Sequence, residues 1–268
     1  MGTVTSPAWE YIRVRTSLTS IDTIRATSAT LGDLGARYML HPDTSAAGTA
    51  AGYANGMAWY VAGRGGVLGD VHADVVVAAF GFFNPDLIRT MWAKGLETEG
   101  ARAAATRYGQ VCAEFGRARL GGVDGLDRFC ELAEKVVNAV HPSGVSLFAA
   151  WRGEPLPADA PARAYWLIAL LREWRGSEHI VAVRASGLTP LQSVLTGYDN
   201  EERIALAVRM MGYRDVTEDA SALKQKRRDA EALTDALLVP GFDALTAEER
   251  GEFAALVDRI KDALDANK

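Results

Sequence analysis

Residues that build metal and disulfide sites are scarce in this sequence. Its 268 residues include two cysteines, Cys112 and Cys130, without CxxC spacing, and four histidines. Each cysteine stands among apolar residues at helical spacing, which predicts two buried free thiols in a reducing compartment. The histidines form no HxxH or HExxH pattern, whereas zinc and iron sites usually show at least one close pair of ligands. The sequence therefore predicts no metal site, and it indicates no particular cofactor.

Long apolar runs and an excess of positive charge are lacking as well. The longest uncharged apolar stretch, residues 75–83, is far shorter than the ~20 residues of a membrane-spanning helix, and the N-terminus has no apolar core of the signal-peptide type. We therefore expect a cytoplasmic protein without membrane contact. The formal net charge is -5, so the molecule as a whole repels a polyphosphate. The one dense basic run, residues 224–228, is interpreted as a solvated helix face.

Recognised motifs of nucleotide binding and nucleophilic catalysis are absent. The glycine-rich segment 63–69 follows a helical pattern instead of a strand, carries Leu68 where a dinucleotide fingerprint needs its third glycine, and precedes no Walker lysine. No GxSxG sequence occurs. We interpret segment 63–69 as a helix end whose glycines allow close packing.

Helical periodicity, in contrast, runs along most of the chain. Apolar residues recur at intervals of three and four, and the chain lacks strand–helix–strand alternation, so we predict a mainly α, multi-helix globular fold. Residues 75–77 are the one place where a strand competes with a helix, and the neighbouring alanines favour the helix. The predicted helices cover residues 18–40, 46–63, 71–83, 85 onward, 98–120, 124–140, 165–174, 200–211, 221–239 and 246–264.

Capping residues and prolines divide this helical chain. Pro42 ends the first helix, and Asp43 or Thr44 is expected to cap the second. Thr246 opens the last helix with a capping box. The proline-rich stretch 151–161 predicts an extended connection between an N-terminal and a C-terminal half.

The most chemically suggestive segment lies in the strongly apolar helix after this connection. If that helix continues to residue 179, Arg172, Arg175 and His179 stand three and four residues apart and share one stripe. Such a stripe could bind a carboxylate, phosphate or enolate, with His179 as a general acid/base and the arginines stabilising a developing anion. The competing interpretation makes the same arginines partners of Glu173 and Glu178 in structural ion pairs, beside a hydrogen-bonded, inert histidine.

Four short motifs occur together along the chain. They are Tyr60-x-x-Gly63-Arg64 with Leu68-Gly69, Phe80-x-x-Phe83-x-Pro85, Leu171-Arg172-Glu173-x-Arg175-Gly176-x-x-His179, and Glu231-x-x-Thr234-Asp235. With them the sequence resembles an actinobacterial family of uncertain biochemistry that carries a helix-turn-helix, MarR-like label. The resemblance extends from about Tyr38 to Leu238, and its best-matched block is the third motif.

This resemblance implies a helical fold in which a helix-turn-helix and a wing occupy residues 189–217. Three acidic residues, Asp199, Glu201 and Glu202, lie where a recognition surface needs positive charge, so DNA is a doubtful partner. The expected organisation is a loosely attached arm over residues 1–17, an N-terminal helical subdomain over 18–150, and a C-terminal helical, winged-helix-like subdomain over 151–268.

Three hypotheses about function are compatible with these features. The first is a small-molecule-binding protein, either a sensor or a metal-independent enzyme of specialised metabolism. The second is a ligand-responsive transcription regulator that binds DNA as a homodimer, and the third is a helical interaction module without catalysis. For the first hypothesis the expected catalytic residues are Arg172, Arg175 and His179, and the expected ligand-binding residues are Tyr60, Arg64 and Asp235.

Overall fold

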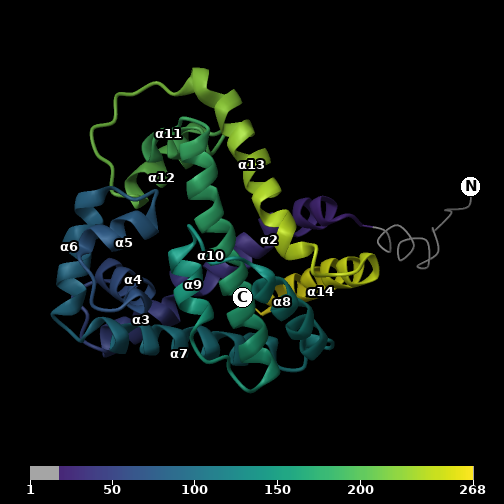
Figure 1. The fold of residues 1–268 in the computed structure, drawn as a ribbon. Coiled ribbons are helices and arrows are strands. Elements are labelled where there is room, and N and C mark those ends of the chain that lie inside the picture. Colours follow the sequence, from purple (N-terminus) through teal and green to yellow (C-terminus); the bar gives the residue numbers. More distant parts are fainter. Residues whose placement is uncertain (1–17, 268) are drawn as a thin grey trace, which may run out of the picture.

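The structure is a computed structural model that describes residues 18–267, and the arm expected over residues 1–17 lies outside the described residues. Within residues 18–267 the regular structure is helical, without a strand, which confirms the mainly α class (Figure 1). The elements are α2 (Ser20–Leu40), α3 (Pro42–Ala50), α4 (Gly56–Gly65), η1 (Gly66–Leu68), α5 (Ala73–Phe80), α6 (Pro85–Leu96), α7 (Ala101–Leu120), α8 (Leu126–Ala139), α9 (Ser146–Arg152), α10 (Ala160–Ala185), α11 (Pro190–Leu195), α12 (Glu201–Met210), η2 (Ser221–Leu223), α13 (Lys224–Phe242) and α14 (Ala247–Ala266).

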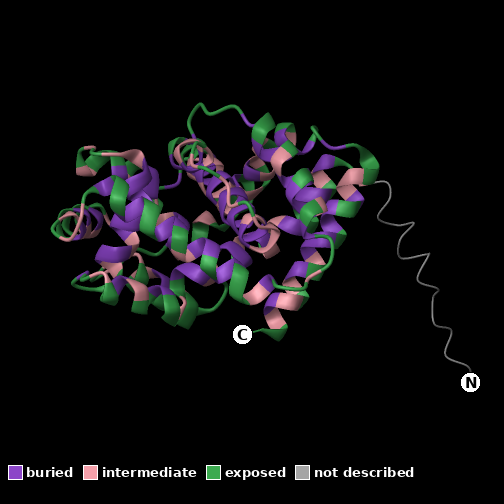
Figure 2. Cartoon of the chain, turned by 90° about the horizontal axis from the view of Figure 1, so that it is seen from below, coloured by how far each residue is buried: buried purple, intermediate pink, exposed green. Residues whose placement is uncertain are grey.

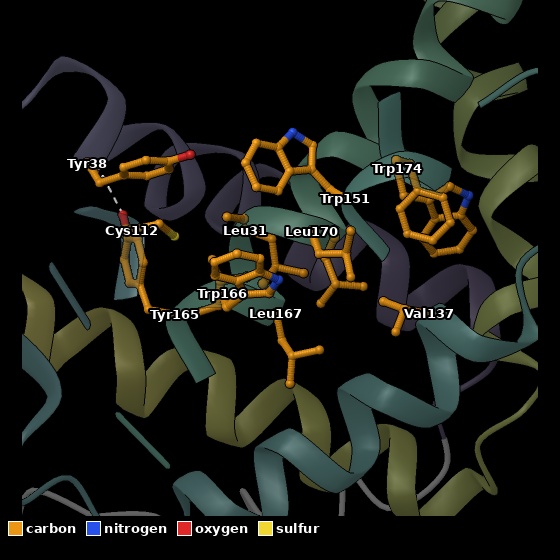
Figure 3. Close-up of a cluster of buried hydrophobic side chains, with 14 of the residues drawn as sticks. Leu31, Tyr38, Cys112, Val137, Trp151, Tyr165, Trp166, Leu167, Leu170 and Trp174 are labelled. Carbon is orange, nitrogen blue, oxygen red and sulfur yellow. Dashed lines mark hydrogen bonds between the residues drawn. The ribbon is translucent and has the colours of Figure 1, made fainter. Parts of the chain in front are cut away.

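Helix α10 runs through the middle of the molecule and packs against α2, α7, α8 and α13 (Figure 1). More than half of its residues are buried. Across the molecule, buried residues lie on the inner helix faces and exposed residues on the outer faces (Figure 2). Tyr165 of α10 donates its hydroxyl proton to the Leu34 carbonyl at 2.6 Å. The same hydroxyl accepts the Tyr38 amide proton at 3.1 Å (Figure 3). These bonds fix α2 against α10. The apolar stripe expected on α10 is buried, at Leu167, Leu170, Leu171 and Trp174.

The second expected helix forms two helices instead, α3 and α4. They are separated by a turn at Gly52, whose φ is 91°, and Asn55 caps α4 through its side chain. The N-cap of α3 is His41, in place of the expected Asp43 or Thr44, because its Nδ1 accepts the Asp43 amide proton at 3.1 Å.

The proline-rich connection is also shorter than expected. Helix α9, which the sequence did not indicate, reaches Arg152, and α10 begins at Ala160. Asp159 caps α10 by accepting the Ala162 amide proton at 3.2 Å, and Pro161 lies in the first turn, where a missing N–H breaks no helical hydrogen bond.

Close packing at two glycines sets the position of α4 and η1 against α7. Gly63 and Gly66 lie against α7, where a Cβ atom would clash with Tyr108 and with the Ala101 backbone, so the glycine-rich segment is the closely packed helix end that we expected.

Helix α5 covers the segment in which a strand competed with a helix, and the structure confirms the helix. It ends at Gly81, whose φ is 57° and whose missing side chain leaves room for Ile180 of α10. The next residue, Phe82, therefore lies against α10, with its ring centroid 5.4 Å from that of His179.

Helices α11 and α12 occupy the segment in which the resemblance implies a helix-turn-helix, and we call them the α11–α12 pair. Thr189 opens α11 with a capping box, and Asn200 caps α12. The C-terminal end of α12 is tied to the start of α6, because the Asn84 amide donates to the Met211 carbonyl at 2.8 Å. Residues 213–220, where a wing is implied, form a loop that arches towards α13 (Figure 1).

Candidate functional site

The six residues nominated from the sequence divide between two polar groups around α10. The first group, which we call the Arg64 network, consists of Arg64, Glu173, Tyr60 and Arg172. The second, which we call the His179 cluster, consists of His179, Thr234, Arg175, Glu231 and Arg227. Asp235 lies at the edge of this cluster, with its carboxylate 3.8 Å from Arg25 Nε, and burial raises the pKa of this carboxyl. The nominated residues thus do not meet in one pocket.

The Arg64 network joins α4 to α10 inside the core. Arg64 donates from Nε and Nη2 to the two carboxylate oxygens of Glu173 at 2.8 and 2.7 Å, and from Nη1 to the Tyr60 hydroxyl at 2.9 Å. Arg172 donates a further bond to Glu173 at 3.1 Å. The Arg64 guanidinium also lies 4.5 Å from the centroid of the Phe80 ring, which adds a cation–π contact.

The charges of the Arg64 network compensate each other. Arg64 is 8% exposed and Glu173 4% exposed. Burial opposes ionisation of Glu173, but the charge and hydrogen bonds of Arg64 outweigh it and hold the pKa of this carboxyl below its usual range. The hydrogen-bonding groups of this ion pair are engaged by one another, so we assign the network a structural role.

The His179 cluster joins α10 to α13. The imidazole Nδ1 of His179 lies 2.8 Å from the Thr234 hydroxyl oxygen. Arg175 donates from Nη2 to one carboxylate oxygen of Glu231 at 2.8 Å, and Arg227 donates to the other. His179 Nε2 is 3.8 Å from Glu231 Oε1, which is beyond hydrogen-bonding distance.

The hydrogen bonds of the cluster assign the tautomer of His179. The Thr234 hydroxyl donates its proton to the Ala230 carbonyl at 2.7 Å, so its oxygen accepts a proton from His179 Nδ1. Burial lowers the pKa of His179 to about 4; Glu231 opposes this shift, while Arg227 and Arg175 add to it. The imidazole is therefore neutral at pH 7, with its proton on Nδ1 and an unshared electron pair on Nε2.

A cavity of about 200 Å³ lies beside this imidazole, between α10, α13 and the α11–α12 pair, and we call it the His179 cavity. Arg227 is held at its wall by a bond from Nη1 to the Ser193 hydroxyl at 2.6 Å. The polar lining residues are His179, Ser193 and Arg227, and the others are Phe82, Val194, Gly197, Tyr198, Ala207 and Met211.

Two buried nitrogen atoms of the cluster, His179 Nε2 and Arg175 Nε, have no hydrogen-bond partner among residues 18–267. Buried polar atoms in folded proteins are nearly always paired, and an unpaired one costs about 1–3 kcal/mol. His179 is 7% exposed, and its Nε2 atom is buried. An unsatisfied acceptor on the ring that lines the His179 cavity marks this place as the candidate functional site.

Several residues of this site were not nominated from the sequence. Arg227 belongs to the basic run interpreted as a solvated face, but its side chain is only 20% exposed because it bonds Ser193 and Glu231. Glu231 and Thr234 were visible as a motif, and their spacing of three places both on one face of α13, which is the signal that could have found them. Phe82 belongs to a set of aromatic residues that the sequence favours as core, and no sequence pattern pointed to Ser193.

Within the described range, 18–267, no three His, Cys, Asp or Glu side chains come together as a metal ion would require. No helix in that range combines the length and apolar character needed to cross a membrane. The two cysteines are buried free thiols, as expected.

Comparison with known proteins gives one match. A family model described as a helix-turn-helix family matches residues 24–268. No curated protein matches the chain, and no solved structure does so.

Proposed function

The chain belongs to this helix-turn-helix family, and we propose that it is a small-molecule-binding protein, a sensor whose ligand occupies the His179 cavity. The observation that carries this proposal is the unpaired Nε2 of a buried histidine beside a cavity. Polar atoms that are left unpaired in the free protein and can be satisfied by a ligand are typical of binding sites.

The position of the cavity also connects ligand binding to the α11–α12 pair. Ser193 and Val194 of α11 and Ala207 of α12 form part of its wall, so an occupant contacts the α11–α12 pair directly. Helix α12 buries only Ala207 among its residues, and few apolar contacts hold it in place. A bound molecule therefore stabilises one position of α12 relative to α10 and α13.

Binding is better supported than catalysis at this site. An efficient general base has a pKa near the working pH, whereas burial holds the pKa of His179 at about 4. The neutral imidazole is a good hydrogen-bond acceptor under these conditions. Arg172, the third residue nominated for catalysis, bonds Glu173 in the Arg64 network and does not line the cavity.

Filling the cavity tests the proposal. We expect Ala207→Leu, which adds apolar volume at the cavity wall, to abolish binding of a fragment set of benzene, toluene, phenol, benzoate and indole to the full chain, measured by ligand-observed NMR. Ala205→Leu on the exposed face of the same helix is the matched control and should bind like the wild type. Wild-type protein that binds none of the fragments, or an Ala207→Leu variant that binds them unchanged, would contradict the proposal.

A second candidate is a ligand-responsive, MarR-like regulator that binds DNA as a homodimer. Membership of a helix-turn-helix family supports the DNA-binding part of this candidate. We expect weak DNA binding, with Kd values of about 10⁻⁶ M or above for random and promoter-proximal duplexes at physiological salt. The reason is that Glu201 and Glu202 occupy the exposed first turn of α12, where they repel phosphates.

A gel-shift assay measures this binding, and the double variant Glu201→Lys/Glu202→Lys should bind the same duplexes more tightly. Sequence-selective binding of the wild type at nanomolar concentration would overturn the expectation and favour the regulator.

A further inference from the structure

The His179 cavity restricts the chemistry of its ligand. This inference rests on the proposed function and concerns the same site. We infer that the ligand is a neutral molecule about the size of one aromatic ring that donates an O–H or N–H hydrogen bond to Nε2 of His179.

The requirement for a donor follows from the bonds around the imidazole. The proton on Nδ1 is donated to the Thr234 hydroxyl oxygen, because the hydroxyl donates its own proton to the Ala230 carbonyl. Nε2 therefore carries no proton and is a hydrogen-bond acceptor. Glu231 Oε1, 3.8 Å from Nε2, is also an acceptor and cannot satisfy it. Only a group that carries a proton completes this site.

Neutrality follows from the charges of the cluster. The Glu231 carboxylate is engaged by Arg175 and Arg227, and Arg227 is further engaged by Ser193. An anionic group at Nε2 would meet a nitrogen without a proton and would have no hydrogen bond to donate to it. A cation would face two guanidinium groups. A neutral hydroxyl or N–H group meets neither penalty.

The size follows from the cavity. The His179 cavity opens to solvent and has a volume of about 200 Å³, which exceeds the volume of about 150 Å³ at which an enclosed apolar cavity binds benzene. Val194, Ala207 and Met211 supply apolar walls for a ring. Because Nε2 is itself covered, a ligand reaches it only when a neighbouring side chain shifts. The half-buried Phe82 ring lies beside the imidazole, with 5.4 Å between the two ring centroids.

Matched probes test the inference on the full chain. Phenol carries the donor, anisole is the same ring with the hydroxyl methylated, and benzene lacks the group. We expect phenol to bind at least roughly tenfold more tightly than anisole, because anisole leaves the buried acceptor unpaired. In ¹⁵N NMR spectra of histidine-labelled protein, phenol should shift the Nε2 resonance of His179, and anisole and benzene should not.

The outcomes separate this inference from the function on which it rests. If phenol and anisole bind equally and both compete at the cavity, the donor inference is wrong and the binding function stands. If none of the three perturbs residues of the cavity, both are wrong. His179→Phe should bind phenol and anisole alike; a variant that still prefers phenol by tenfold would place the donor contact elsewhere, and the wild-type spectra decide the matter if this variant does not fold.

Discussion

Replacing Glu173 by glutamine is expected to lower the free energy of unfolding by about 3–5 kcal/mol, because it leaves the buried Arg64 guanidinium charged without its counter-charge. Glutamine keeps the shape of the side chain and one acceptor oxygen, so the effect reports mainly the missing charge. For a chain of this size the melting temperature should fall by roughly 6–20 °C. Urea-induced unfolding and thermal melts followed by circular dichroism at pH 7 measure both quantities.

Two control variants accompany this measurement. Glu114→Gln removes the charge of an exposed carboxylate that pairs with Arg117, and it should change stability little because water solvates both partners. The double variant Arg64→Met/Glu173→Leu removes both buried charges and should be more stable than Glu173→Gln alone. If Glu173→Gln costs no more than Glu114→Gln, the structural role of the Arg64 network is wrong.

Acidification from pH 6.5 to pH 4.5 is expected to lower the free energy of unfolding by about 2–3 kcal/mol through the protonation of His179. In the unfolded chain this imidazole takes up a proton near pH 6.5. In the folded protein burial lowers its pKa to about 4, aided by Arg227 and Arg175 and opposed by Glu231. Between these values the unfolded state binds more protons, so stability is greatest above pH 6.5 and falls as the pH drops towards 4.

Urea-unfolding curves at half-unit intervals of pH measure this loss, and His179→Asn isolates it. Asparagine can still donate to Thr234 but does not titrate, so stability of this variant should vary less between pH 6.5 and 4.5. His72→Asn changes an exposed histidine that caps α5 and should leave the wild-type slope intact. Parallel profiles for the wild type and His179→Asn would show that the imidazole is not held neutral.

Most long helices were predictable because each has an apolar face of its own. The longest, α10, was expected only over residues 165–174, whereas it spans Ala160–Ala185 and is buried on several sides. Helices α2, α7, α8 and α14 appear close to their expected bounds, and the Thr246 capping box opens α14 as expected. Short helices were harder. The break between α3 and α4 depends on the left-handed turn at Gly52, and α9 and α11 have only 7 and 6 residues, too few for a periodic pattern to be distinguished from a loop.

The candidate site was predictable only in part. The spacing of Arg175 and His179 placed both on one stripe of α10, and both face Glu231. The same spacing also placed Arg172 on this stripe. In the structure Arg172 bonds Glu173, and Glu173 also binds Arg64, which lies 109 residues before it in the chain. Which carboxylate a buried arginine meets depends on the tertiary packing of α4 against α10, and helical periodicity does not contain that information.

Helix α10 carries residues of both the Arg64 network and the His179 cluster, so a rotation of this helix moves both groups together. Glu173 and His179 are six residues apart on one continuous helix, a rise of about 9 Å. The bidentate contact with Arg64 is directional, so it permits one rotation of α10 about its own axis and thereby fixes the direction in which the imidazole projects. Residues of the Arg64 network thus set the orientation of a side chain that lines the His179 cavity, and substitutions there are expected to reorient this imidazole without altering any residue of the cavity wall.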